Sequence, residues 1–204
     1  MLPGNFSFEI KRKIFHLASI IFPVLYLFLS KGLMIQLLFI ITLFTLYLDI
    51  FRHYNPKIKE LTSKIFTKIM RTHEKGGSFK LSGASFMALG FFITACFFPQ
   101  VLTIVAWLVL IMADSAASLI GSRFGTTLTN GKSLAGSAAF FICTVIIGIG
   151  YYYYLGYDTN FIVIIASAVI TTIAEFYSKS LKIDDNLLIP IAYAGSAQLV
   201  GMFF

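Results

Sequence analysis

The sequence predicts an all-α polytopic membrane protein with about seven transmembrane helices, and three observations support this fold class. Apolar residues make up 58% of the 204 residues and charged residues only 12%, with a mean hydropathy of +0.85. Seven apolar runs approach the length of about 20 residues that an α-helix needs to cross a bilayer. Basic residues gather on one side of these runs, as the positive-inside rule requires. A soluble domain would carry about 25% charged residues, so we treat 1–204 as a single integral membrane domain.

The predicted spans follow one another along almost the whole chain. They cover residues 14–30, 33–51, 81–98, 100–120, 135–155, 160–177 and 187–203. Alternating ten-residue segments typical of a membrane β-barrel are absent from the sequence, which leaves helices as the spans. The first run follows three basic residues, as in a signal peptide, but no small-residue cleavage site comes after it. We therefore expect a retained first span.

The distribution of charge orients the predicted bundle with its N-terminus in the cytoplasm. The cytoplasmic segments are then 1–13, 52–80, 121–134 and 178–186. With the helix ends included, this side holds every Lys and Arg except Lys31, and every acidic residue except Asp158. The opposite orientation would reverse the positive-inside rule. We expect any chemistry at the cytoplasmic face, because the other loops are short and nearly without polar side chains.

The long second cytoplasmic segment has a pattern of its own. Apolar residues recur at helical spacing beside a mostly basic charged stripe, which predicts a basic amphipathic helix at about 55–75 in the headgroup region. Its main expected role is a surface anchor that attracts anionic lipid. The alternative is an electropositive wall over an active site.

Asp114 is an ionisable residue inside the fourth predicted span, where such groups are costly and usually face the bundle interior. Asp114, Ala117, Gly121 and Gly125 share one face of the predicted helix. Small residues at this spacing are typical of a helix-packing seam, which accounts for the glycines but not for the carboxylate. Because Mg²⁺ binds one or two carboxylates together with phosphate oxygens, we expect Asp114 to serve a metal or a nucleotide.

The loop at about 121–134 resembles a Walker A phosphate-binding loop at first sight, because it contains Gly131-Lys132-Ser133. Five residues rather than four separate Gly125 from Gly131, and no strand precedes the loop, so this motif is excluded. Glycines, hydroxyls and cations beside a helix N-terminus still suit a polyphosphate. The candidate nucleotide contacts are Gly121, Arg123, Gly125, Gly131, Lys132 and Ser133.

Further acidic residues lie on the same predicted face of the membrane. Glu175 ends the sixth span, and Asp184, Asp185 and Asn186 precede the seventh. Alone, the last three residues are typical of a turn and a helix N-cap. Beside Asp114 and its neighbouring loop, a second metal or base role competes with that interpretation.

A possible acceptor or supporting site lies at the inner ends of the first two spans. Glu9, Lys13 and His16 form one stripe there, and Asp49 lies three residues before Arg52. The alternative for Asp49 and Arg52 is a local ion pair. The alternative for His16 is an interfacial hydrogen bond.

Six motifs together resemble the CTP-dependent lipid-alcohol kinases, which include dolichol, phytol, farnesol and CTP-using diacylglycerol kinases. The motifs are EIKRKIFH (9–16), DIFR (49–52), LSGASF (81–86), ADSAASLIGSRFG (113–125), GKSLAGSAAF (131–140) and AEFYSKSLKIDDNLLIP (174–190). They follow the order of that family and span nearly the whole chain. The similarity is greatest to the phytol-kinase branch.

The resemblance implies transfer of the γ-phosphate of CTP, with Mg²⁺, to the hydroxyl of a membrane lipid alcohol such as phytol, a polyprenol or diacylglycerol. On this hypothesis Arg123 and Lys132 hold the triphosphate with the loop glycines, and Asn186 joins the nucleotide contacts. The expected catalytic residues are Asp114, Lys132, Glu175 and Asp185. The expected metal ligands are Asp114, Glu175 and Asp184.

Two other classes of protein compete with this hypothesis. A phosphatidate cytidylyltransferase-like enzyme would also use CTP but would make a CDP-lipid. A small membrane transporter would need polar residues and broken helices near the bilayer midplane, whereas the polar residues here lie at one end of the spans. The expected partners are the lipid substrate and membrane lipids, without nucleic acid. We expect a bacterial inner membrane or, in a eukaryote, the endoplasmic reticulum or a plastid membrane, with the site facing the cytoplasm.

Overall fold

The computed structural model describes residues 13–14, 16–55, 81–128, 131–154, 156 and 160–203, and these residues form helices and connections with no strand among them. The elements are α2 (Ile21–Phe28), α3 (Lys31–Tyr54), α5 (Gly83–Phe97), α6 (Gln100–Leu108), a π-helical segment η2 (Val109–Ala113), α7 (Asp114–Phe124), α8 (Leu134–Tyr154), α9 (Phe161–Leu181) and α10 (Asp185–Gly201). Each predicted span contains a helix, so the all-helical class is confirmed. The predicted interfacial helix lies outside the described residues except for Asn55.

Several helices have the length and composition of membrane spans. Four qualify among the described residues: Lys31–Arg52, Gln100–Phe124, Leu134–Tyr154 and Phe161–Leu181. Two further apolar helices are shorter, His16–Phe28 and Gly83–Phe97, and α10 has 17 residues. These helices indicate a membrane protein. The count of seven spans and their orientation remain predictions.

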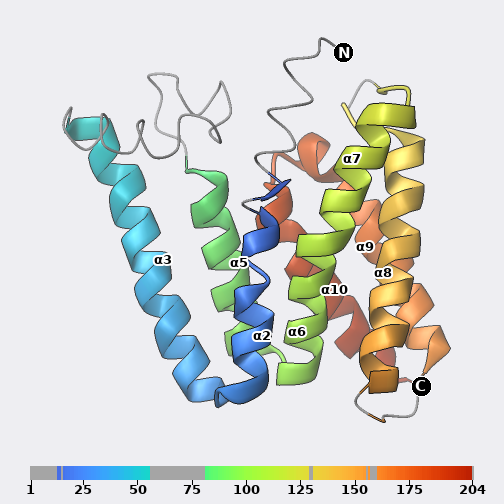
Figure 1. The fold of residues 1–204 in the computed structure, drawn as a ribbon, viewed down its shortest axis with the longest axis horizontal. Coiled ribbons are helices and arrows are strands. Elements are labelled where there is room, and N and C mark those ends of the chain that lie inside the picture. The colour runs from blue at the N-terminus through green and yellow to red at the C-terminus, as the bar shows by residue number, and fades with distance from the viewer. Residues whose placement is uncertain are drawn as a thin grey trace.

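The Gln100–Phe124 helix is the centre of the bundle. In its most apolar stretch 61% of the residues are buried, against 22% in α3. Figure 1 shows α2, α3 and α5 on one side of it, α8 and α9 on the other, and α10 crossing behind it. Trp107 stacks on Tyr26 and Phe91 with ring centroids 5.3 and 4.6 Å apart, and its Nε1 donates to Thr94 Oγ1 at 2.7 Å. This aromatic core fixes the central helix against its neighbours.

The central helix changes its winding just before Asp114. The π-helical segment η2 adds a residue to the turn, a feature that is frequent at functional sites. His16 Nε2 lies 3.1 Å from the Leu110 carbonyl oxygen within this segment. The α-helix resumes as α7, and Asp114, Ala117 and Gly121 are all buried, as the predicted stripe requires. The π segment itself was not predicted from the sequence.

The polar ends of several helices meet at one end of the bundle, the upper end in Figure 1. Between α9 and α10, Lys182 adopts a left-handed φ of 58°, and the Ile183 N–H donates to the Ser178 carbonyl oxygen at 3.1 Å. The chain therefore reverses within a few residues. This tight reversal brings the last turns of α9, with Glu175, beside the first turn of α10, with Asp185.

Candidate active site

Ionisable side chains from five parts of the chain meet inside the bundle, toward the end at which α7 ends and α10 begins. The members of this charged cluster are Lys13, His16, Asp114, Lys132, Glu175 and Asp185. All six were predicted from the sequence as candidate site residues. Their meeting supports one shared site, although the catalytic role of each remains a prediction. Glu9, the acidic candidate of the first motif, lies outside the described residues.

Asp114 is paired with a lysine from the beginning of the described chain. Lys13 Nζ donates to Asp114 Oδ2 and, at 3.3 Å, to the main-chain carbonyl oxygen of the same residue. His16 Nε2 lies 3.8 Å from Asp114 Oδ2. Lys13 and Asp114 are only 3% and 8% exposed, so each charge depends on the other for compensation. The helix face of Asp114 offers no cation, and the partner comes from 101 positions earlier in the chain.

Lys132 bridges the two remaining carboxylates. Its Nζ lies 2.5 Å from Glu175 Oε1 and 2.9 Å from Asp185 Oδ2. Burial disfavours the ammonium, but the negative charges of Asp185, Glu175 and the nearby Asp114 outweigh burial and raise the pKa of Lys132. The side chain is therefore a permanent cation at neutral pH.

A tight turn directs Lys132 into the bundle. Gly131 has a φ of +71°, a conformation that favours glycine. Its N–H donates to the Leu128 carbonyl oxygen at 2.8 Å, and the Leu128 N–H donates to the Lys132 carbonyl oxygen at 2.8 Å. Lys179 Nζ donates to the Gly131 carbonyl oxygen at 3.3 Å. Gly131 thus shapes the loop, and its contact with a nucleotide stays a prediction.

Each carboxylate beside Lys132 keeps one oxygen that has no hydrogen-bond partner in the described part of the chain. These atoms are Glu175 Oε2 and Asp185 Oδ1, and both are buried. Because buried polar atoms are almost always paired, two neighbouring orphan oxygens indicate a place for a cation or a donor. Within the described part of the chain, no set of three or more His, Cys, Asp or Glu side chains forms a metal site by itself. A metal ion here would take fewer protein ligands.

Three adjacent residues at the start of α10, for which similar roles were predicted, make different contacts in the structure. Asp184 is the N-cap, and its Oδ1 accepts a hydrogen bond from the Asn186 N–H at 3.0 Å. Asp185 is the residue that contacts Lys132. Asn186 Nδ2 donates to the Gly83 carbonyl oxygen at 3.2 Å and ties α10 to α5. Capping and packing thus account for Asp184 and Asn186 in this structure, whereas Asp185 joins the charged cluster.

The glycines of the predicted nucleotide loop lie in a packing seam between α7 and α8. A Cβ on Gly121 would lie 2.7 Å from Ser133 Oγ, and a Cβ on Gly136 would lie 2.9 Å from the Ala117 carbonyl oxygen. A Cβ on Gly125 would lie closer still to Ser133 Oγ. Ser133 Oγ is buried and accepts a hydrogen bond from the Gly136 N–H at 3.0 Å. The small-residue alternative thus accounts for Gly121, Gly125 and Ser133 without a ligand.

Arg123 lies apart from the charged cluster. It occupies the last turn of α7, is exposed, and places its guanidinium 5.5 Å from the ring centroid of Phe124. The structure therefore does not bring this predicted triphosphate contact to Lys132.

Asp49 and Arg52 form a second, smaller group that includes residues the sequence analysis missed. Asp49 Oδ2 accepts hydrogen bonds from Ser82 N at 2.7 Å, Ser82 Oγ at 2.9 Å and Ser85 Oγ at 2.6 Å. Arg52 Nη2 lies 3.3 Å from Asp49 Oδ1. The local ion pair is thus present, and Asp49 also fastens α3 to the N-terminus of α5. The serines of the LSGASF motif were the sequence feature from which these partners of Asp49 could have been predicted.

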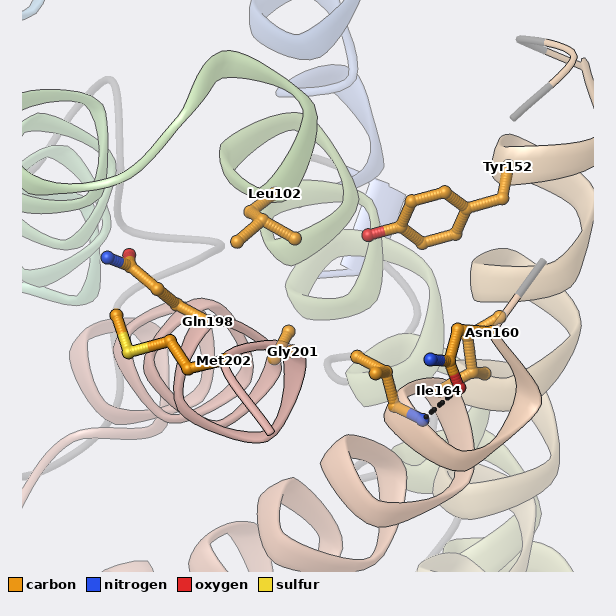
Figure 2. Close-up of a pocket in the computed structure, with 9 residues that line it drawn as sticks. Leu102, Tyr152, Asn160, Ile164, Gln198, Gly201 and Met202 are labelled. Atoms are coloured by element: carbon orange, nitrogen blue, oxygen red, sulfur yellow. Dashed lines mark hydrogen bonds between the residues drawn. The ribbon is translucent and has the colours of Figure 1, made fainter. Parts of the chain in front are cut away.

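A pocket of about 420 Å³ lies at the opposite end of the bundle, between α6, α8, α9 and α10. Figure 2 shows the Tyr152 hydroxyl pointing toward Leu102 across it. The lining residues include none of the predicted site residues. The pocket is therefore separate from the charged cluster.

The chain is similar over nearly its whole length to two uncharacterized proteins. It is 51% identical to one from Rickettsia prowazekii, with 98% of each chain covered. It is 30% identical to one from Methanocaldococcus jannaschii, with 91% of each chain covered. The chain belongs to the same family of proteins as these two.

Shorter stretches are similar to two enzymes with a named activity. CTP-dependent diacylglycerol kinase 1 of Schizosaccharomyces pombe is 30% identical over 48% of this chain and 44% of that enzyme. The enzyme of the same name from Saccharomyces cerevisiae is 33% identical over 68% of this chain and 48% of that enzyme. The chain thus spans about half the length of these relatives, and the match supports a distant relation to CTP-dependent lipid kinases. No protein-family model and no solved structure matches the chain.

Proposed function

We propose that this protein is a CTP-dependent kinase that transfers the γ-phosphate to the hydroxyl of a membrane lipid alcohol. The charged cluster carries this proposal, because it gathers two lysines and three carboxylates, each buried or largely buried, within a bundle of apolar helices. Phosphoryl transfer needs positioning and charge neutralisation more than covalent chemistry. The distant similarity to CTP-dependent diacylglycerol kinases supports the donor and the class of acceptor.

The carboxylates of the cluster fit a magnesium ion. Mg²⁺ binds one or two protein carboxylates and completes its shell with waters and phosphate oxygens. Glu175 and Asp185 each offer an oxygen without a protein partner, and Asp114 offers a third carboxylate, now paired with Lys13. Asp184 is less suited because its side chain caps α10. When bound, the ion would neutralise negative charge on the polyphosphate.

The protein's own cations neutralise the rest of that charge. Lys13 is buried and Lys132 is largely buried, and electrostatic attraction is stronger in such a site than in water. They are the groups we expect to hold the phosphates of CTP. Arg123, at the exposed end of α7, remains a candidate contact for the part of the nucleotide outside the bundle.

The acceptor reaches the cluster from the bilayer, with its chains between helices and its hydroxyl at the level of Glu175 and Asp185. Either carboxylate can orient the hydroxyl and accept its proton. We propose an isoprenoid alcohol, as in the phytol-kinase branch, or diacylglycerol as the acceptor. Seven spans with a cytoplasmic N-terminus would place the cluster at the face where CTP is available.

The test is an assay of the purified protein in lipid nanodiscs with Mg²⁺ and CTP labelled at the γ-phosphate. We expect the label on one member of a panel of phytol, polyprenol and diacylglycerol, and the release of CDP. Label on pyrophosphate with an unlabelled lipid would instead identify a cytidylyltransferase. Solute flux into liposomes without nucleotide turnover would identify a transporter. The same panel with labelled ATP tests the choice of CTP.

A further inference from the structure

The two carboxylates that contact Lys132 carry more negative charge than this one lysine neutralises. Lys132 contacts one oxygen of each, Glu175 Oε1 and Asp185 Oδ2. The second oxygen of each, Glu175 Oε2 and Asp185 Oδ1, is buried and has no hydrogen-bond partner among the described residues. In this part of the chain one ammonium thus contacts two carboxylates, which leaves one formal negative charge between them. The neighbouring pair of Lys13 and Asp114 is already neutral and contributes no excess cation.

We propose that Glu175 and Asp185 form a divalent-cation site which Lys132 occupies while the protein holds no nucleotide, so that the ammonium and the cation exchange on the same two carboxylates. A divalent cation in place of the ammonium would neutralise both carboxylates and use the orphan oxygens. Mg²⁺ ordinarily takes one or two carboxylates from a protein, and this site offers two. The absence of any larger ligand group among the described residues fits a site that is completed by water or phosphate.

The position of Lys132 suits it to this exchange. Its ammonium stands on a flexible four-carbon stem. The residue belongs to the connection between α7 and α8 and follows the turn at Gly131, rather than lying inside a helix. Release of the lysine therefore requires no movement of a helix. The released ammonium would then be available to a triphosphate, and this last step rests on the proposed function.

The first experiment measures binding of Mn²⁺, as a paramagnetic probe for Mg²⁺, to the full-length protein without nucleotide by electron paramagnetic resonance. Lys132→Met should bind Mn²⁺ about tenfold more tightly than the wild type, since the competing cation is gone. Glu175→Gln and Asp185→Asn should abolish the binding. The matched control is Lys179→Met, which removes a lysine at the same end of the bundle that donates to the Gly131 carbonyl oxygen. Equal tightening in both lysine variants, or none in Lys132→Met, would overturn the proposal.

A second experiment needs no variant and remains informative if Lys132→Met fails to fold. Acylation of lysines in the wild type is followed by mass spectrometry as Mn²⁺ is added. The exchange predicts that Lys132 becomes more reactive while Lys179 is unchanged. An unchanged rate at Lys132 when Mn²⁺ is bound would contradict the exchange. Both experiments omit CTP and lipid, so their outcome is independent of whether the protein is a kinase.

Discussion

At the scale of single residues, the sequence identified the members of the charged cluster but not their partners. Ionisable groups in or beside apolar runs stand out because they are costly there, and this signal singled out Asp114 and Glu175. The pairing of Asp114 with Lys13 depends on tertiary packing across 101 positions. Adjacent residues of the same type also make different contacts. Asp184 caps α10 and Asp185 contacts Lys132, and composition alone does not distinguish them.

Asp114→Asn should reduce phosphoryl transfer at least about 100-fold, because an amide neither holds a cation nor neutralises Lys13. The same change leaves a buried ammonium unpaired, which should cost about 3–5 kcal/mol of unfolding free energy. The double variant Lys13→Met with Asp114→Asn removes both charges and should recover most of the lost thermal stability without recovering activity. Turnover of labelled CTP and thermal unfolding in detergent check these outcomes. Substantial turnover in either variant would remove Asp114 from the catalytic residues.

Lys132 should stabilise the protein equally across the neutral pH range. Its pKa is raised in the folded state, so the stabilisation is fully present below the unfolded-state pKa of about 10.4 and is lost only as pH rises through the higher folded value. The difference in melting temperature between the wild type and Lys132→Met should therefore stay constant between about pH 6.5 and 9. Thermal unfolding at a series of pH values measures it. If the difference in melting temperature already decreases between pH 7 and 9, the ammonium loses its proton well below the raised pKa expected for Lys132.

At the scale of elements, the positions of the helices followed from local information, whereas their irregularities did not. Long apolar runs predicted every helix among the described residues, because hydropathy and length are properties of the segment itself. The π segment η2 depends on neighbours such as His16, which contacts its Leu110 carbonyl oxygen. The GxxxG spacing of Gly121 and Gly125 predicted a packing seam correctly, but the partner helix α8 became visible only in the structure.

The seam between α7 and α8 predicts a contrast between two glycines of the same helix. A Cβ on Gly136 would lie 2.9 Å from the Ala117 carbonyl oxygen and 3.3 Å from Gly121 Cα, whereas a Cβ on Gly150 would meet nothing within 4 Å. Gly136→Val should therefore cost about 1–3 kcal/mol of stability through overpacking. Gly150→Val carries the same β-branched side chain and serves as the control. Thermal unfolding of the two variants decides the matter, and equal melting temperatures would show that the seam tolerates a side chain.

At the scale of the whole molecule, the connections at one end of the bundle assemble the site. The loop before α8 and the reversal between α9 and α10 bring Lys132, Glu175 and Asp185 together, and the residues that precede α2 bring Lys13 to Asp114. This arrangement uses both ends of the sequence. It explains why four weak motifs spread over the chain can belong to one site. The pocket at the other end shares none of these residues.

The proposed topology predicts which side of the membrane each end of the bundle faces. Three helices, α8, α9 and α10, lie between Phe124 and Phe203, so three crossings should put these residues on opposite sides. Both are well exposed, at 71% and 81%. After replacement of the native Cys96 and Cys143 by alanine, Phe203→Cys should react with a membrane-impermeant maleimide in right-side-out vesicles, and Phe124→Cys only in inverted ones. Labelling of both from the same side would mean that one of the three helices does not cross. Labelling of Phe124→Cys from the outside alone would reverse the orientation, and the charged cluster would then lie away from cytoplasmic CTP.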